Sequence, residues 1–277
     1  MPSPTHSPAT ISHFQTTRNG VLHLDFELRN GQTVLTRDLQ KAPLMIVRPF
    51  VLPCGTLSAF IVNPTGGVLG GDHAEIRVSV GPGARVLLLT QSATRIQPSP
   101  TGLDAVQDIR FTVATGARLE YYPERSIPFA GSRFVQSIRA ELEDGAEFGM
   151  TETLAAGRVA MGERLKFERY RSSVEVQRAG RRVYLDRLDL QPGAQHLDAP
   201  GLLGGRAYSA SGVWVGDTPG SEFPAVPGVL ASGLGGSGAI WLRAAAHRGP
   251  DLDVALAGAR QAVRAGLFGA GPLQVRR

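Results

Sequence analysis

Three stretches of the chain alternate apolar and polar residues with a period of two. They are IRVSVGPGA (76–84), IRFTVATGA (109–117) and IRAELEDGA (138–146), and DRLDLQPGA (186–194) is a degenerate fourth copy. Such alternation is typical of a half-buried β-strand, and the Pro-Gly, Thr-Gly and Asp-Gly pairs that follow it favour turns. Recurrent strand–turn–strand units of this kind predict stacked β-layers, each of which buries one face on the next.

Helical periodicity is confined to the end of the chain, in DLDVALAGARQAVRAGLFG (251–269). We expect Asp251 or Asp253 to cap this helix, because a side-chain oxygen at the N-cap accepts a hydrogen bond from the first turn. The predicted fold class is therefore mainly β: a β-helix-like stack of strand–turn–strand repeats with one or two short C-terminal helices. Residues 1–18 are rich in Pro and Ser and are predicted to form a flexible tail, and 19–277 a single domain.

Composition narrows the class of protein further. The chain has 277 residues, 42% of them hydrophobic and 19% charged, which is typical of a globular protein. Its one cysteine, Cys54, cannot form an intramolecular disulfide and fits a reducing compartment. No apolar run reaches the ~20 residues that cross a bilayer. We expect a cytoplasmic protein that does not bind a membrane.

The net charge of +5 comes from arginines that alternate with acids, as in GERLKFERYR (162–171). This pattern favours an ion-paired surface over a nucleic-acid groove, so no nucleic-acid partner is expected. An acidic protein partner would satisfy the same excess of positive charge.

The glycine-rich stretch NPTGGVLGGD (63–72) invites comparison with a phosphate-binding loop, but the chain has no G-x-x-x-x-G-K-[ST]. A G-x-G-x-x-G does occur, as GLGGSG (233–238), and a nucleotide-binding enzyme that uses this loop is the alternative interpretation. The sequence after it, AIWLRAAAH, begins like a strand, and no βαβ unit surrounds it, whereas a dinucleotide fingerprint needs one. The match therefore favours a turn.

Other catalytic or metal-binding patterns are missing from the sequence. It contains no Cys-x-x-Cys, no His-x-x-x-His and no G-x-S-x-G, so neither a closed zinc site nor a nucleophile elbow is predicted. The chain is not expected to be an enzyme. Carboxylates inside otherwise apolar segments are of more interest, because a buried acid needs a partner, water or a transient ion. They are Glu120, Glu124, Glu152 and Glu163.

Several segments together resemble one family, the UreD (also UreH) urease accessory proteins. They are KAPLMIVRPF (41–50), NPTGGVLGGD (63–72), LLLTQSATRI (87–96), LEYYPERSIPFAGSRF (119–134) and ETLAAGRVAMGE (152–163). Their order and spacing are similar to those of the family over about residues 20 to 215. The resemblance implies a scaffold that acts with UreF and the GTPase UreG to load Ni²⁺ into the urease apoprotein, and a stack of strands with short C-terminal helices.

The resemblance also implies that Ni²⁺ passes through an internal path, with no cofactor permanently bound. By the positions of the family's motifs, Asp72, Thr94 and Glu152 are placed along this path, with Glu120 and Glu124 as weaker candidates. Oxygen ligands would hold Ni²⁺ weakly and exchangeably, whereas nitrogen- and sulfur-rich sites would hold it tightly. The scarcity of cysteine and of clustered histidine is consistent with such a path.

Overall fold

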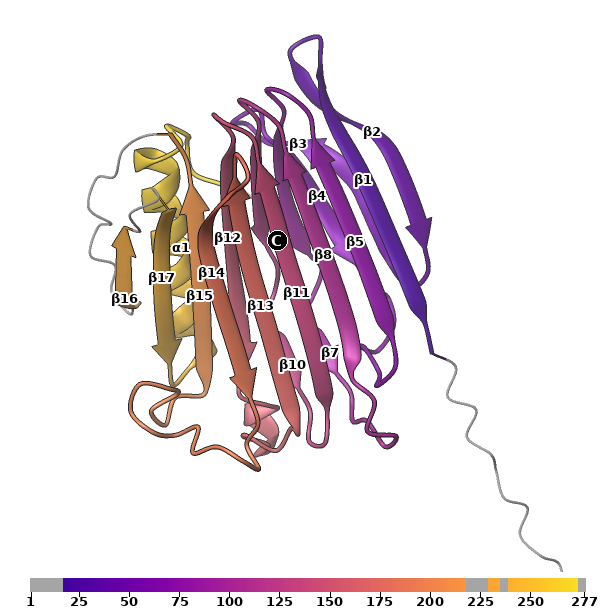
Figure 1. The fold of residues 1–277 in the computed structure, drawn as a ribbon, viewed down its shortest axis with the longest axis vertical. Helices are drawn as coiled ribbons and strands as arrows, with labels where there is room; N and C mark the ends of the chain where they lie inside the picture. The colour runs from indigo at the N-terminus through magenta and orange to yellow at the C-terminus, as the bar shows by residue number, and fades with distance from the viewer. Residues whose placement is uncertain (1–16, 218–228, 235–238, 274–277) are drawn as a thin grey trace, which may run out of the picture.

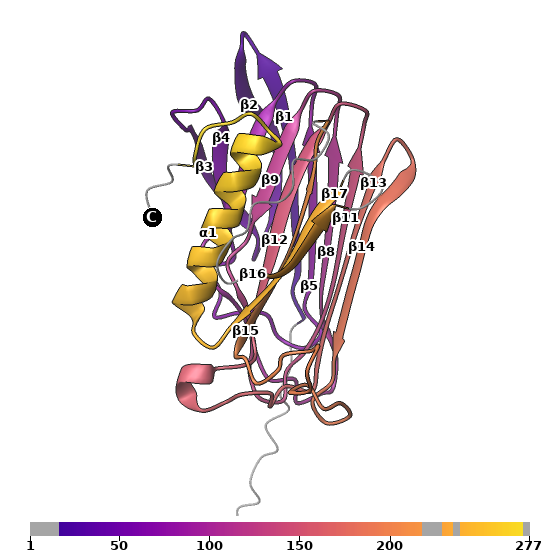
Figure 2. The same ribbon diagram turned by 90° about the vertical axis from the view of Figure 1, so that its left-hand side faces the viewer.

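The structure, a computed structural model, describes residues 17–217, 229–234 and 239–273. Most of the predicted tail, 1–18, therefore lies outside the described residues, as does the GGSG part of the GLGGSG loop (235–238). The described chain forms two β-sheets that face each other, with one helix on the outer face of the second sheet (Figures 1 and 2). The prediction of a mainly β, stacked-strand fold with a C-terminal helix is confirmed.

Sheet A contains seven strands, in the spatial order β14 (Arg181–Leu190), β13 (Arg169–Arg178), β11 (Arg133–Leu142), β8 (Ala105–Val113), β5 (His73–Val80), β1 (Asn19–Arg29) and β2 (Gln32–Lys41). Sheet B has the order β16 (Val229–Leu234), β17 (Ala239–Ala246), β15 (Tyr208–Val215), β12 (Glu147–Ala155), β9 (Arg118–Tyr122), β6 (Arg85–Thr90), β4 (Leu57–Val62) and β3 (Met45–Val51). The short strands β7 (Thr94–Ile96) and β10 (Ser126–Pro128) pair with each other, and β10 also pairs with β12.

The sequence repeat sets the register of sheet A. Its first three copies begin within β5, β8 and β11 and form the second part of each strand. These strands are parallel neighbours, and Ile76, Ile109 and Ile138 lie directly opposite one another. All three isoleucines are buried between the sheets. Parallel in-register copies follow from the repeat because each unit ends in a tight turn and then supplies one strand to sheet B.

The Gly-Ala pairs of the repeat form these tight turns. Gly83, Gly116 and Gly145 have φ of 70°, 68° and 75°, the left-handed region in which glycine carries no steric penalty. The alanines that follow them are buried in the core. The fourth copy behaves differently: β14 pairs antiparallel with β13, a strand without the Ile-Arg motif, so this copy ends the stack and adds no further parallel layer.

Longer loops connect the strands at the opposite end, the lower end in Figure 1, and most of the segments that resemble the UreD family lie there. In the glycine-rich loop, Asp72 follows Gly70 and Gly71. A Cβ at Gly70 would lie 2.6 Å from the carbonyl oxygen of Leu103, and Gly71 has a φ of 89°. These glycines allow the backbones of two loops to pack directly on each other.

Helix α1 (Gly249–Gly266) covers the outer face of sheet B over β15 and β17 (Figure 2). Leu252, Leu256 and Val263 pack there against Trp214 and Leu242. The predicted cap was wrong. The N-cap residue is Arg248, which makes no side-chain capping bond, and Pro250 occupies the first turn, where its missing N–H costs nothing. Asp253 instead pairs with Arg125 at 2.7 Å. Among the described residues, no helix is both long and apolar enough to span a membrane.

Candidate functional site

Two apolar clusters fill the space between the sheets, and polar side chains separate them. The first cluster, nearer the tight turns, includes Phe148 and Met150 of β12, and the second, nearer the long loops, includes Leu154 of the same strand. Glu152 lies between them on β12. We call the separating residues the polar layer; they are Gln107, Gln136, Glu152, Ser172, Asp186 and Arg243.

The register of sheet A brings part of the polar layer together. Gln107, Gln136 and Ser172 lie directly opposite one another on β8, β11 and β13. Each occupies an inward position of its strand: Gln136, for example, lies between the buried Phe134 and Ile138. The alternation that makes apolar residues face the core therefore also turns these polar residues inward.

Glu152 is the centre of this arrangement. Its Oε1 accepts hydrogen bonds from Gln136 Nε2 at 2.6 Å and from Ser172 Oγ at 2.7 Å. The pKa of Glu152 is raised to about 7, chiefly by burial and also by the nearby Asp186, while the hydrogen bonds from Ser172 and Gln136 oppose the rise. The carboxyl group therefore keeps its proton to a higher pH than an exposed glutamate does.

Cavities lie at both ends of the polar layer. A cavity of about 400 Å³ is lined by Thr94, Gln107, Gly66 and Gly67, which brings the predicted Thr94 and part of the glycine-rich loop next to the layer. A cavity of about 30 Å³, close to the volume of one water molecule, adjoins Glu152 at the other end.

An ion pair closes that second end. Asp186 of β14 pairs with Arg243 of β17, so it joins the last strand of sheet A to sheet B. The carboxyl group of Asp186 is largely buried, whereas the Arg243 side chain is 42% exposed. The layer therefore runs from the cavity beside Thr94, whose rim includes the exposed Gly66 and Arg95, to a charged pair at the molecular surface.

Asp72 lies in the glycine-rich loop, where it holds the backbone. Its Oδ1 accepts a hydrogen bond from the backbone N–H of Arg18 at 2.9 Å, and its Oδ2 one from that of Leu69 at 2.9 Å. Both carboxylate oxygens thus bind peptide groups, and the side chain is only 8% exposed. In this geometry Asp72 stabilises the loop and ties β1 to it.

Glu120 lies on the opposite face of sheet B, under helix α1 and away from the polar layer. It is fully buried and pairs with Arg264 of α1, and its Oε2 accepts a hydrogen bond from Tyr122 Oη at 3.1 Å. Tyr122 in turn accepts one from Trp214 Nε1 at 3.1 Å. These contacts attach the C-terminal helix to the sheet, a role that the sequence reasoning missed.

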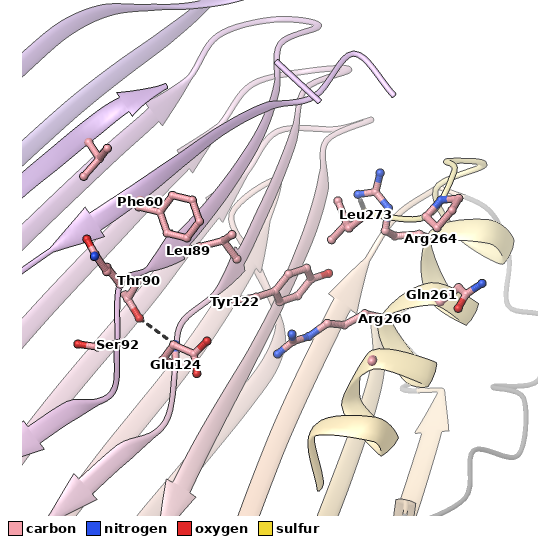
Figure 3. A pocket seen from close by; sticks show the side chains of 14 residues that line it. Phe60, Leu89, Thr90, Ser92, Tyr122, Glu124, Arg260, Gln261, Arg264 and Leu273 are labelled. Carbon is pink, nitrogen blue, oxygen red and sulfur yellow. Dashed lines mark hydrogen bonds between the residues drawn. The ribbon is translucent and has the colours of Figure 1, made fainter. Parts of the chain in front are cut away.

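Glu124 lines a groove on the same outer face, shown in Figure 3. Its backbone N–H donates to Thr90 Oγ1 at 2.8 Å. The groove has a volume of about 670 Å³ and runs between β4 and β6 on one side and α1 on the other. Phe60 and Leu89 line its apolar side, and Arg260, which lies over the ring of Tyr122, lines the other.

The five predicted site residues thus divide into three places. Glu152 and Thr94 border the polar layer and its cavity, Asp72 holds a loop, and Glu120 and Glu124 belong to the outer face of sheet B. Within the described ranges, no group of three or more His, Cys, Asp or Glu side chains is gathered as it would be in a metal site.

The sequence reasoning named Glu152 but not the residues that surround it. For Gln136 and Ser172 a usable signal exists: each is a polar residue at an inward position of an alternating strand, in RFVQSIRAEL and RYRSSVEVQR. Asp186 and Arg243 come from distant segments, and no local pattern pairs them.

These features define a class: a stacked-strand protein whose core is divided by a layer of polar side chains, most of which carry oxygen atoms. The comparisons with known proteins then identify the family. The model of the "UreD urease accessory protein" family matches residues 18–277, so the chain belongs to this family.

Relatives of the chain carry the same description. The chain is 61% identical over 272 residues to the urease accessory protein UreD of Deinococcus radiodurans, an alignment that covers 96% of this chain and 98% of the relative. It is 38% identical over 194 residues to UreD of Herpetosiphon aurantiacus, which covers 70% and 68%. It is 35% identical over 191 residues to UreD of Acetivibrio thermocellus, which covers 69% and 72%.

Proposed function

We propose that this chain is a non-catalytic scaffold in urease maturation, that it acts in a complex with UreF and the GTPase UreG, and that Ni²⁺ passes along its polar layer on the way to the urease apoprotein. The observation that carries the path is the polar layer itself. A core that served only folding would not place a carboxyl group with a pKa of about 7 between two apolar clusters.

The chemistry of the layer suits a cation in transit. Its donors are carboxylate, amide and hydroxyl oxygens, and oxygen donors bind Ni²⁺ less tightly than imidazole or thiolate. Glu152 can release its proton as the cation arrives and take one up as the cation leaves. In this proposal Glu152 and Thr94 border the path, whereas Asp72 keeps the adjoining loop in place.

The exposed apolar side chains at one edge of sheet B support a role within a protein complex. The edge strand β3 exposes Met45, Val47, Phe50 and Val51, each more than 40% accessible, and Val47 also lines the groove between β4, β6 and α1. Exposed apolar side chains on an edge strand favour association with another protein.

The test is urease activation in cells that carry the full urease operon, with this chain deleted, restored, or restored as Glu152→Gln. Glutamine retains the shape of the side chain and one acceptor oxygen but carries no charge. The matched control is Asp144→Asn, an exposed carboxylate in the turn between β11 and β12. Activity, nickel content of the purified urease and recovery of the partners are measured together.

We expect Glu152→Gln to assemble with its partners and to leave urease poor in nickel, while Asp144→Asn behaves like the wild type. Full nickel loading by Glu152→Gln would refute the path through Glu152. Full activity after deletion of the chain would refute the maturation role as a whole.

The alternative, a nucleotide-binding enzyme, has less support. Gly233 lies in β16, which pairs antiparallel with β17, whereas the dinucleotide fingerprint opens a helix after a parallel strand. Tight dinucleotide binding that is lost in Gly235→Ala would favour this alternative.

A further inference from the structure

The outer face of sheet A carries a row of arginines that the polar layer and the groove do not use. Arg77, Arg110 and Arg139 lie directly opposite one another on the parallel strands β5, β8 and β11. We call them the arginine row. All three side chains are exposed, on the face of the sheet turned toward the viewer in Figure 1. Neighbouring strands are about 4.8 Å apart, so three positive charges stand side by side.

The charges of the sheet do not neutralise this row. Arg77 pairs with Glu75 at 3.1 Å, but within the part of the chain that the structure describes neither Arg110 nor Arg139 forms an ion pair. The nearest opposite charge in the row itself is Glu175, which lies beside Arg139 on β13. Like charges directly opposite each other destabilise a sheet. Arg110, which has an arginine on both sides, therefore adds no favourable charge pair to the fold.

Carboxylates flank the row on both sides. Glu75 and Asp108 are opposite each other two residues before the arginines, and Glu141 lies two residues after Arg139. Together with Arg77 and Arg110, Glu75 and Asp108 border a shallow surface cavity of about 140 Å³. Along the strands, the charge of this surface therefore changes from negative to positive and back to negative.

We propose that the arginine row is a docking surface for a segment of another protein of the urease machinery, one whose carboxylates meet the row and whose basic groups meet the carboxylates beside it. The alternating bands favour a protein over a nucleic acid, because a phosphate backbone is uniformly negative and would lie over the flanking carboxylates. A protein surface can match both signs, and such complementarity determines the speed and specificity of association. The proposal relies on the family for the partner's identity and is independent of the Ni²⁺ path.

The decisive variant is Arg110→Glu, at the centre of the row. The substitution places a negative charge between two neighbouring arginines, so two like-charge pairs become opposite-charge pairs and the fold is not weakened. It also interrupts the row of positive charge. Arg187→Glu is the matched control: it is exposed on the same face, in β14, and changes the net charge equally. The two variants therefore separate the row from the overall charge.

The measurement is the binding of purified wild type and both variants to a co-expressed assembly of UreF, UreG and urease apoprotein, at two salt concentrations, with an oligonucleotide as a second probe. At about 0.1 M salt we expect Arg110→Glu to bind about tenfold more weakly and Arg187→Glu less than about twofold, with both differences much smaller at about 1 M.

Three results would overturn the proposal: equal binding by all three proteins, equal loss in both variants, or a loss that appears only with the oligonucleotide. The outcome is distinguishable from that for the Ni²⁺ path, because Glu152→Gln is expected to lower nickel loading without lowering partner binding.

Discussion

Replacing Glu152 by glutamine is expected to stabilise the protein at alkaline pH. The side chain lies between two apolar clusters, and burial raises its pKa from 4.5 to about 7. The folded protein therefore binds this proton more tightly than the unfolded chain does. Because of that difference, the contribution of Glu152 to stability is fully present below the unfolded pKa, falls between pH 4.5 and 7, and stays low above the folded pKa.

The magnitude follows from the shift. One pKa unit corresponds to about 1.4 kcal/mol, so the rise to about 7 amounts to roughly 3 kcal/mol of lost stability once the group is ionised. Glutamine can still accept the hydrogen bonds from Gln136 and Ser172 but carries no charge. At pH 8 we expect Glu152→Gln to be about 1–3 kcal/mol more stable than the wild type, and at pH 5 the difference should fall below about 1 kcal/mol.

The assay is equilibrium urea unfolding at intervals from pH 5 to pH 8. Glu141→Gln, on the exposed face of sheet A, is the control and should alter the free energy of unfolding by less than about 0.5 kcal/mol at every pH. A difference between Glu152→Gln and the wild type that does not grow with pH would refute the reasoning, because it would mean that the ionised carboxylate is already fully compensated in the fold.

Three further substitutions test a buried ion pair, a close backbone contact and the arginine row. Glu120→Gln leaves the buried guanidinium of Arg264 without its counter-charge, and we expect a loss of about 3 kcal/mol or more in urea unfolding; replacing both residues by leucine and methionine should restore most of it. Gly70→Ala places a Cβ 2.6 Å from a carbonyl oxygen and should cost about 2 kcal/mol, whereas Gly66→Ala, which meets no atom within 4 Å, should cost much less. Arg110→Glu should raise the free energy of unfolding by about 0.5 kcal/mol and the melting temperature slightly. A lower free energy of unfolding would contradict the like-charge argument.

The fold could be predicted largely because its information is local and repeated. Period-two alternation marks the strands, and the shared Ile-Arg and Gly-Ala positions place Ile76, Ile109 and Ile138 in one row. The exceptions are not local. Strand β13 enters the stack without the motif, and the antiparallel direction of β14 follows from a short hairpin at Ala179 and Gly180, both with positive φ.

The site could be predicted less well, because its contacts join distant segments. Glu120 was recognisable as an acid in an apolar strand, but its partner Arg264 is 144 residues away, so the sequence did not separate an ion pair from a cation path. The polar layer is an intermediate case. Gln136 and Ser172 were predictable as inward polar residues, whereas Asp186 and Arg243 meet only because the last strands of both sheets lie together.

Glu120 and Glu152 show why a carboxylate among apolar residues does not by itself indicate function. Glu120 has a full counter-charge in Arg264 and a hydrogen bond from Tyr122, so the fold itself accounts for its presence. Glu152 accepts hydrogen bonds only from neutral donors among the described residues, and its pKa shows that these do not offset its desolvation. Glu152 therefore destabilises the folded state at neutral pH, and we infer that its role is in the proposed cation path.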